Sequence, residues 1–317
     1  MSLMARRLAL FALLLITATV CAPPPASTPA ATTAASPLAT RAHYPATVTD
    51  DRGKTLTLSA PPVRIVSLAP SATEILFALG AGGLIVAADD FSDFPAETKA
   101  IPKVGGFRTS PDKIVSLQPH LILSLLSGNL PAQLDALSQP LFVFDPADID
   151  GVYRNIRMVG TLVDREREAE ALVADMSTRI GRIGERAKQA STKPRVLHEV
   201  DSTNPSQIYV AGPHNFIDSM ITTVGGRNVA ADAAAKYPKL SLEEIVARDP
   251  EIIVLADFKF GTTPEMVMAR PAWSAIAAVK ARAIYPIDDD LVSRPGPRLV
   301  LGFEAYAKLV HPEIFGP

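Results

Sequence analysis

The chain has 317 residues, of which 48% are hydrophobic and 20% charged, and its formal net charge is −2. This length is enough for two domains of ordinary size, and the near-neutral charge gives no reason to expect a nucleic acid or an anionic membrane surface as a partner. A single cysteine excludes an internal disulfide and a zinc site built from several cysteines.

The N-terminus has the layout of a secretory signal followed by a tether. Arg6 and Arg7 precede an apolar run at residues 8–16, and small residues follow. We therefore predict a signal peptide over residues 1–21. Residues 22–43 are rich in Pro, Ala and Thr, a composition that buries little apolar surface, so we predict an extended tether there.

The single cysteine, Cys21, lies just after the apolar run. This arrangement resembles a bacterial lipoprotein, in which the cysteine after the signal carries the lipid. Residues 18–20 depart from the usual pattern, because Val20 stands where a small residue is expected. The resemblance implies lipidation of Cys21 and a membrane anchor; otherwise the signal is simply removed. In both cases we expect the protein to work outside the cytoplasm, in the periplasm or at the outer face of the cell membrane.

The first lobe, predicted over residues 44–163, begins with a hairpin at residues 44–60, where polar and apolar side chains alternate around a turn. A helix is predicted at residues 72–79, capped by Ser71 and ended by Gly80. Buried strands are predicted at residues 63–68, 84–88 and 141–144.

One long helix is predicted at residues 164–190, which contain no proline. Their apolar residues recur at steps of three and four, which is one stripe of an α-helix. The stripe consists of Ala169, Leu172, Met176, Ile180, Ile183 and Ala187. About 27 residues at about 1.5 Å each give roughly 40 Å. The other face is mostly charged, so we expect it to meet water.

The same short motif occurs on both sides of this helix. Residues 112–123 and 243–254 each begin with an acid, continue with Ile-Val, reach a proline and end in an apolar run. The pattern predicts a short helix, a stop at the proline and a buried parallel strand. Two such units indicate two similar lobes joined by the helix at 164–190, the second covering residues 191–317. Chance similarity between two ordinary helix–strand units is the alternative.

The second lobe is predicted to contain strands, a helix and a buried tryptophan. Asn215 lies near the start of the helix expected at residues 217–224, and Trp273 is expected in the core. Tyr237 lies in a loop that we expect to lead directly into a helix. The strands are predicted at residues 195–200, 207–211 and 283–287.

Several segments together resemble a known family. They are RIVSLAPSATEILFALGAG (64–82), SDFP (92–95), IPKVGGF (101–107), PDKIVSLQPHLILS (111–124), NFIDSMITTVGG (215–226), LSLEEIVARDPEIIVL (240–255) and RPGPRLVLGFEAYAKLVHPE (294–313). Their order and spacing are similar to the solute-binding proteins that feed ABC importers for iron–siderophores, haem and vitamin B12. The resemblance implies the class III periplasmic binding protein fold, an α/β fold with two Rossmann-like lobes bridged by one long α-helix.

The resemblance also implies a set of ligand-binding residues. In the vitamin B12-binding branch of the family, aromatic residues at the positions matching Phe91, Phe107 and Tyr237 contact the corrin, and the positions of Asp290 and Arg294 line the cleft. Loops after parallel strands form such clefts, and Phe91 and Asp290 each follow a predicted strand. Packing of each aromatic onto its own lobe, and a solvated acidic loop at residues 288–290, are the alternatives.

Three further residues have open roles. His214 is a candidate axial ligand for a cobalt or iron centre, and equally a polar residue at a helix start. Asp112 and Glu243 begin the two copies of the repeated motif. In the family, acids there meet arginines of the membrane permease, whereas the alternative is an acid favoured at a helix N-terminus by about 0.3–1 kcal/mol. Asp112 departs from the family in its shorter side chain.

An enzyme is disfavoured, because the chain has no GxxxxGK[ST] loop, GxSxG elbow, HExxH or CxxC motif. A chelatase-like enzyme with a similar two-lobed fold is the alternative. We expect a monomeric solute-binding protein without a cofactor or metal site of its own, which delivers a metal chelate to an ABC permease and its ATPase. The exposed aromatics favour cobalamin as ligand. A ferric siderophore or haem is the alternative, and haem would need His214, Tyr209 or Tyr237 as iron ligand.

Overall fold

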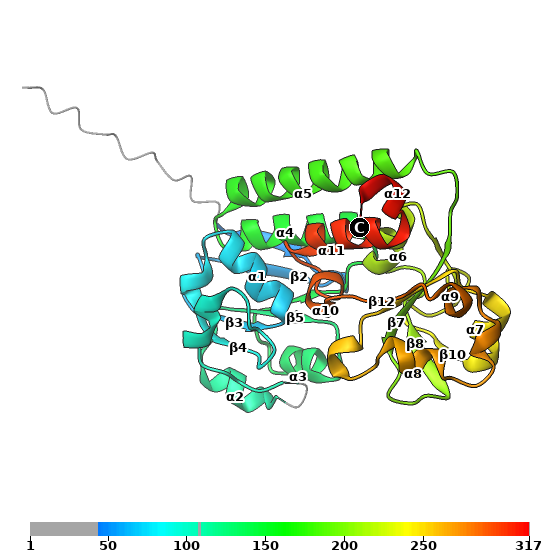
Figure 1. The fold of residues 1–317 in the computed structure, drawn as a ribbon. Helices are drawn as coiled ribbons and strands as arrows, with labels where there is room; N and C mark the ends of the chain where they lie inside the picture. The colour runs from blue at the N-terminus through cyan, green and yellow to red at the C-terminus, as the bar shows by residue number, and fades with distance from the viewer. Residues whose placement is uncertain (1–43, 107–108, 317) are drawn as a thin grey trace, which may run out of the picture. The chain divides into compact units, whose positions relative to one another are not determined.

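Two large β-sheets, one in each lobe, are joined by one long helix, and a two-stranded hairpin sheet adds to the first lobe (Figure 1). The computed structural model describes residues 44–106 and 109–316. The predicted signal, the tether, Cys21 and Phe107 therefore lie outside the described residues.

The first sheet has four parallel strands in the order β4-β3-β5-β6. Its strands are almost wholly buried, as expected for a parallel sheet with both faces covered. The strands are β3 (Ile65–Leu68), β4 (Ile85–Ala88), β5 (Leu121–Leu125) and β6 (Leu141–Phe144). The helices around them are α1 (Pro70–Ala78), η1 (Gly82–Leu84), η2 (Ala96–Ala100), α2 (Pro111–Ser116), α3 (Leu130–Ala136) and α4 (Ile149–Leu162).

The predicted hairpin is confirmed as β1 (Ala46–Thr49) and β2 (Thr55–Leu58), which pair antiparallel. The buried Asp50 organises its turn. The Asp50 carboxylate accepts from the backbone N–H groups of Arg52 and Lys54, both at 3.0 Å, and from that of Val143 at 3.3 Å. One side chain thus closes the turn and ties the hairpin to β6.

The second sheet is mixed. Strands β7, β9, β11 and β12 are parallel, and β8 runs antiparallel to β7 and β10. The strands are β7 (Arg195–Asp201), β8 (Gln207–Val210), β9 (Arg227–Asn228), β10 (Lys239–Ser241), β11 (Ile252–Leu255) and β12 (Ile284–Pro286). The helices are α6 (Phe216–Thr223), α7 (Leu242–Arg248), η3 (Phe258–Phe260), α8 (Pro264–Met268), η4 (Trp273–Ala275), α9 (Ala277–Ala281), α10 (Asp289–Val292), α11 (Leu299–Val310) and α12 (Pro312–Phe315).

The long helix is α5 (Glu166–Ala187), whose 22 residues span about 33 Å. It lies within the predicted range and buries most of the predicted stripe. The phase differs at one position, since Val173 is buried while Leu172 is only partly covered. Helices α4, α6 and α11 pack against α5 (Figure 1).

The hydrophobic core is continuous between the lobes on one side only. A single cluster runs from Ile65 of β3 through Met176 of α5 to Phe303 of α11. The opposite side of each sheet has its own separate cluster, around Ile122 in the first lobe and Ile253 in the second. The bridge between the lobes is therefore a packed helical layer rather than one isolated helix.

The repeated motif folds as predicted in both lobes. It forms α2 followed by β5 in the first and α7 followed by β11 in the second. The residue before each proline, Gln118 or Asp249, has a positive φ, of 49° and 42°. Each short helix thus ends in a left-handed residue before the proline starts the next segment.

Two local predictions are wrong. Ser71 does not cap α1, because Pro70 already occupies the first turn and Ala69 stands at the N-cap. Tyr237 precedes β10 rather than a helix. The expectation for Trp273 is confirmed, since its side chain is fully buried.

Candidate functional site

Two hollows lie at the carboxyl ends of the parallel strands, the edge at which open α/β sheets bind ligands. The N-lobe hollow, with a volume of about 260 Å³, lies beyond β3, β4 and β5 and includes Asp89 and Phe91. The C-lobe hollow, with a volume of about 730 Å³, lies beyond β7 and β11 and includes Ser202 and Asp257.

Phe91 presents its ring at the N-lobe hollow, and 45% of the residue is exposed. Its backbone N–H donates to Oδ1 of Asp89 at 2.8 Å. A side chain at Gly106 would begin only 2.9 Å from the Phe91 ring, so a glycine is needed for the ring to lie against that loop. Phe91 therefore lies at the carboxyl edge of the sheet, where its position after a predicted strand led us to expect it.

Asp89 is a buried acid in the same hollow. Burial raises the pKa of its carboxyl, although hydrogen bonds from Ser92 and from the Phe91 N–H, and the charge of Lys103, act in the opposite direction. The Ser92 hydroxyl is also hydrogen-bonded to the Thr73 hydroxyl, with 2.8 Å between the oxygens. The Thr73 hydroxyl is in turn hydrogen-bonded to that of Ser67, at 2.7 Å. This chain of buried hydroxyls fixes the loop after β4 to the start of α1.

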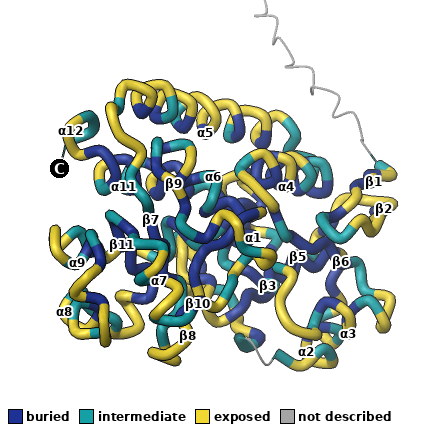
Figure 2. Tube along the Cα trace, turned by 90° about the vertical axis from the view of Figure 1, so that its right-hand side faces the viewer, coloured by how far each residue is buried: buried dark blue, intermediate teal, exposed yellow. Residues whose placement is uncertain are grey.

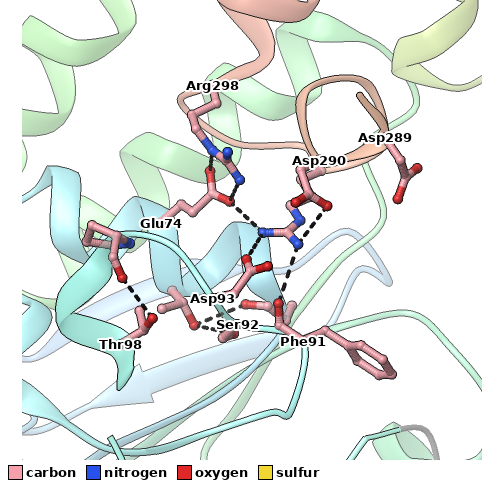
Figure 3. A network of polar contacts seen from close by, with 12 residues as sticks. Glu74, Phe91, Ser92, Asp93, Thr98, Asp289, Asp290 and Arg298 are labelled. Atoms are coloured by element: carbon pink, nitrogen blue, oxygen red, sulfur yellow. Dashed lines mark hydrogen bonds and ion pairs between the residues drawn. The ribbon is translucent and has the colours of Figure 1, made fainter. Parts of the chain in front are cut away.

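A cluster of five charged residues joins the two lobes, and we call it the charge bridge (Figure 3). It consists of Glu74, Asp93, Asp290, Arg294 and Arg298. Glu74 of α1 accepts from Nε and Nη2 of Arg298 at 2.8 and 2.6 Å. The Glu74 side chain is only 2% exposed, so these are ion pairs of low solvent access.

Arg294 is at the centre of the charge bridge. Its Nη1 lies 3.2 Å from Glu74 and 2.7 Å from Asp93, and its Nη2 lies 2.8 Å from Asp290. Nη2 also donates to the backbone carbonyl of Phe91 at 3.4 Å. Burial opposes its charge, but these carboxylates raise the pKa of Arg294 above its usual value. A ligand that reaches this guanidinium would share or replace partners that it already has.

Asp290 extends the charge bridge to the C-lobe hollow. The Lys259 ammonium contacts the Asp290 carboxylate and lies 3.2 Å from that of Asp289. It also lies 5.4 Å from the centre of the Phe260 ring, which lines the C-lobe hollow. Neither Asp290 nor Arg294 is among the residues that line the hollows. Their contacts with Lys259 and with the Phe91 carbonyl nevertheless connect the two hollows.

Tyr237 lies at a second contact between the lobes. Its neighbour Lys236 pairs with Asp145, which follows β6, at 2.8 Å. Burial of the phenol, together with the Asp145 charge, raises the pKa of Tyr237 to about 12, although 39% of the residue is exposed. Tyr237 is not among the residues that line either hollow.

His214 is exposed and has a φ of 60°. It stands directly before Asn215, whose side chain caps α6 by accepting from the N–H groups of Ile217 and Asp218 at 2.9 and 3.0 Å. His214 lines neither hollow. Within residues 44–106 and 109–316, no group of three or more His, Cys, Asp or Glu side chains is arranged to hold a metal ion.

The acids Asp112 and Glu243 occupy the first turns of α2 and α7, and both are exposed. The next acid in α7, Glu244, has a different role, because it forms a capping box with Ser241. Figures 1 and 2 both show α2 and α7 below the level of α5, in different lobes.

The residues of the C-lobe hollow were not predicted from the sequence. Asp257, Phe260 and Met266 follow β11, and Phe260 is 76% exposed. The rule that located Phe91, a loop after a buried strand, would have located them too. The local signal for these residues was the sequence Phe-Lys-Phe-Gly at 258–261, in which two aromatic residues flank a lysine and a glycine follows.

The matching family model is that of periplasmic binding proteins, and it covers residues 65–291. The chain therefore belongs to this family, whose members are solute-binding proteins of transport systems rather than enzymes. Within the described ranges no helix is both long and apolar enough to cross a membrane.

Three relatives illustrate the similarity. An uncharacterized ABC transporter substrate-binding lipoprotein of Bacillus subtilis, YvrC, is 34% identical over 86% of this chain and 87% of its own. The vitamin B12-binding protein of Pectobacterium atrosepticum is 27% identical over 76% and 85%. The apo structure of the periplasmic heme-binding protein RhuT from Roseiflexus is 29% identical with a TM-score of 0.69, covering 78% of this chain and 97% of RhuT.

Proposed function

We propose that this chain is the substrate-binding component of an ABC importer and that it captures a corrinoid. The observation that carries the proposal is the pair of hollows at the carboxyl edges of the two sheets, with the exposed Phe91 residue in one and the exposed Phe260 residue in the other. The charge bridge connects the two hollows. Aromatic surfaces with a few convergent polar groups suit a large, flat, partly apolar ligand. The similarity to a vitamin B12-binding protein supports the same ligand class.

The charges near the hollows support a ligand without strong negative charge. Arg294 and Arg298 are each held by carboxylates, and Lys259 lies against Asp289 and Asp290. Among the described residues near the hollows, few cations therefore remain to attract the carboxylates of haem or an anionic siderophore. Haem is the second candidate, because of the similarity to RhuT. Tyr237 is disfavoured as a ligand for its iron, because burial of the phenol and the Asp145 charge raise the pKa of Tyr237 and so oppose the phenolate form.

The test is equilibrium dialysis of the purified protein against cyanocobalamin, with haemin in parallel. We expect retention of cyanocobalamin and a loss of affinity of about tenfold or more in Phe91→Ala and Phe107→Ala. The matched control is Phe315→Ala, because Phe315 lies on α12 and lines neither hollow. Retention of haemin without retention of cyanocobalamin would indicate that the ligand is haem and not a corrinoid.

We also assign the exposed acids Asp112 and Glu243 to permease docking, one in each lobe. Arg substitutions at both positions should abolish uptake into cells while ligand binding by the purified protein stays unchanged. Glu168→Arg, on the exposed face of α5, is the control and should leave uptake intact. Equal uptake in the double variant and the control would exclude this role.

Anchoring through Cys21 is the corresponding proposal for localisation, with the tether at 22–43 allowing the lobes to reach the permease. Cys21→Ser should move the protein from the membrane fraction to the soluble fraction. A wild-type protein that is itself soluble after export would indicate that the signal is only removed.

A further inference from the structure

The floor of the C-lobe hollow is a carboxylate with one saturated and one unpaired oxygen. Oδ2 of Asp257 accepts from the backbone N–H of Ser202 at 3.1 Å, and from the hydroxyls of Ser202 and Thr262 at 2.7 and 2.8 Å. Oδ1 is buried and has no hydrogen-bond partner within the described part of the chain. Only 4% of Asp257 is exposed. A buried acceptor without a donor is unfavourable, so this oxygen favours a ligand group that brings an N–H or O–H.

The charges of the same hollow disfavour an anion. Asp201 lines it together with Asp257. The lining cation Arg270 is bound by the fully buried Glu199 at 2.5 and 2.6 Å, and its guanidinium lies 4.6 Å from the Trp273 ring. The Arg270 charge is therefore neutralised within the protein. A carboxylate that enters the hollow would meet two acids and no available cation among these residues.

The rim of the hollow is apolar. Phe260 and Met266 expose 76% and 57% of their surfaces, and Gly261 permits the turn between them with a φ of 109°. An acceptor at the floor and apolar side chains at the rim fit a ligand arm with methylene groups and an uncharged hydrogen-bond donor at its end. A primary amide arm has this form.

The hollow is also connected to the rest of the candidate site. Lys259, next to Phe260, contacts Asp290, and Asp290 pairs with Arg294. Arg294 in turn donates to the Phe91 carbonyl at the N-lobe hollow. A ligand large enough to lie between the lobes would therefore extend one arm toward Asp257.

We infer, on the basis of the proposed function, that the C-lobe hollow is a specificity subsite that accepts an amide arm of the ligand and rejects the corresponding carboxylate. Asp257 is the residue that discriminates, and Phe260 with Met266 packs against the arm. The role of Asp257 is to accept the amide N–H and to repel a carboxylate.

The experiment compares dicyanocobinamide, whose peripheral arms are amides, with dicyanocobyrinic acid, in which these arms are carboxylates. Dissociation constants are measured by titration of the visible spectrum. The wild type should prefer the amide form by at least about tenfold, and Asp257→Asn should reduce this ratio several-fold because it removes the negative charge. Circular dichroism checks that the variant is folded.

A second pair of variants decides the case even if Asp257→Asn does not fold. Phe260→Ala should weaken dicyanocobinamide binding about tenfold, whereas Phe258→Ala should not. Phe258 lies in the same loop and is 44% exposed, but it does not line the hollow. Wild-type protein that retains no corrinoid would overturn the proposed function and this inference together. Retention with equal affinities in the two Phe variants, or an unchanged amide preference in folded Asp257→Asn, would overturn the inference alone.

Discussion

Glu74→Ala tests the charge bridge, which ties the C-terminal segment of the second lobe to α1 of the first. Glu74 is 2% exposed and accepts three hydrogen bonds from Arg294 and Arg298. Removing one partner of a buried ion pair costs about 3–5 kcal/mol, because a charge is left without compensation. Arg294 keeps Asp93 and Asp290, and Arg298 keeps 18% exposure and its stacking on Phe94. We therefore expect the lower end, about 3 kcal/mol.

The assay is urea unfolding followed by the fluorescence of Trp273, the single tryptophan of the chain. The matched control is Glu170→Ala, which removes an ion pair with Arg157 of similar length, 2.7 Å, on the exposed surface. That pair should contribute less than about 1 kcal/mol. If the two variants differ by less than about 1 kcal/mol, the bridge does not stabilise the contact between the lobes and the reasoning is refuted.

Three further predictions concern stability. His198 is fully buried against Tyr306, and burial lowers its pKa to about 3 from an ordinary value of 6.5. Its contribution to stability is therefore present well above pH 6.5 and is lost as the pH falls, by about 2 kcal/mol from pH 7 to 5. The His198→Leu/Tyr306→Phe variant should lose that much less in urea unfolding at pH 7 and 5, and an equal acid loss would contradict the assignment. Gly302→Ala should destabilise the protein by about 1–3 kcal/mol, since a Cβ there would collide with the Leu291 carbonyl. Gly181→Ala, with open space around it, should instead stabilise the protein by about 0.5–1 kcal/mol. Chemical denaturation that gives both changes in stability the same sign would refute the packing argument. Asn215→Ala should lower the free energy of unfolding by about 1–2 kcal/mol, because α6 loses its N-cap. Asn204→Ala, in an exposed turn, should lower it by less than half as much, and thermal unfolding of both variants measures the difference.

The elements with local signals could be predicted from the sequence. The proline-ended repeat predicted α2–β5 and α7–β11, and the apolar stripe predicted α5. These signals depend on residues within a few positions of one another, where backbone sterics and helical periodicity act. The same local reasoning failed at Ser71, where Pro70 already starts the helix, and at β10, whose three residues are too few to show a period.

The long-range contacts could not be predicted in this way. Arg294 was assigned to the ligand, but its partner Glu74 lies 220 positions away, and nothing in the sequence near either residue indicates the pair. The return of α11 onto α5, which makes the core continuous between the lobes, depends on the same kind of contact. We expect this shared layer to resist hinge bending, so that the lobes close little around a ligand. Hydrogen exchange that showed α5 opening readily without ligand would count against it.

The central claim, capture of a corrinoid, is tested most directly by the visible spectrum of the purified protein after incubation with cyanocobalamin and removal of free ligand by gel filtration. We expect a red protein fraction with about one cobalamin per chain, and a weaker colour in Phe91→Ala because its affinity is lower. A colourless protein fraction, with all cobalamin eluting as free ligand, would contradict it.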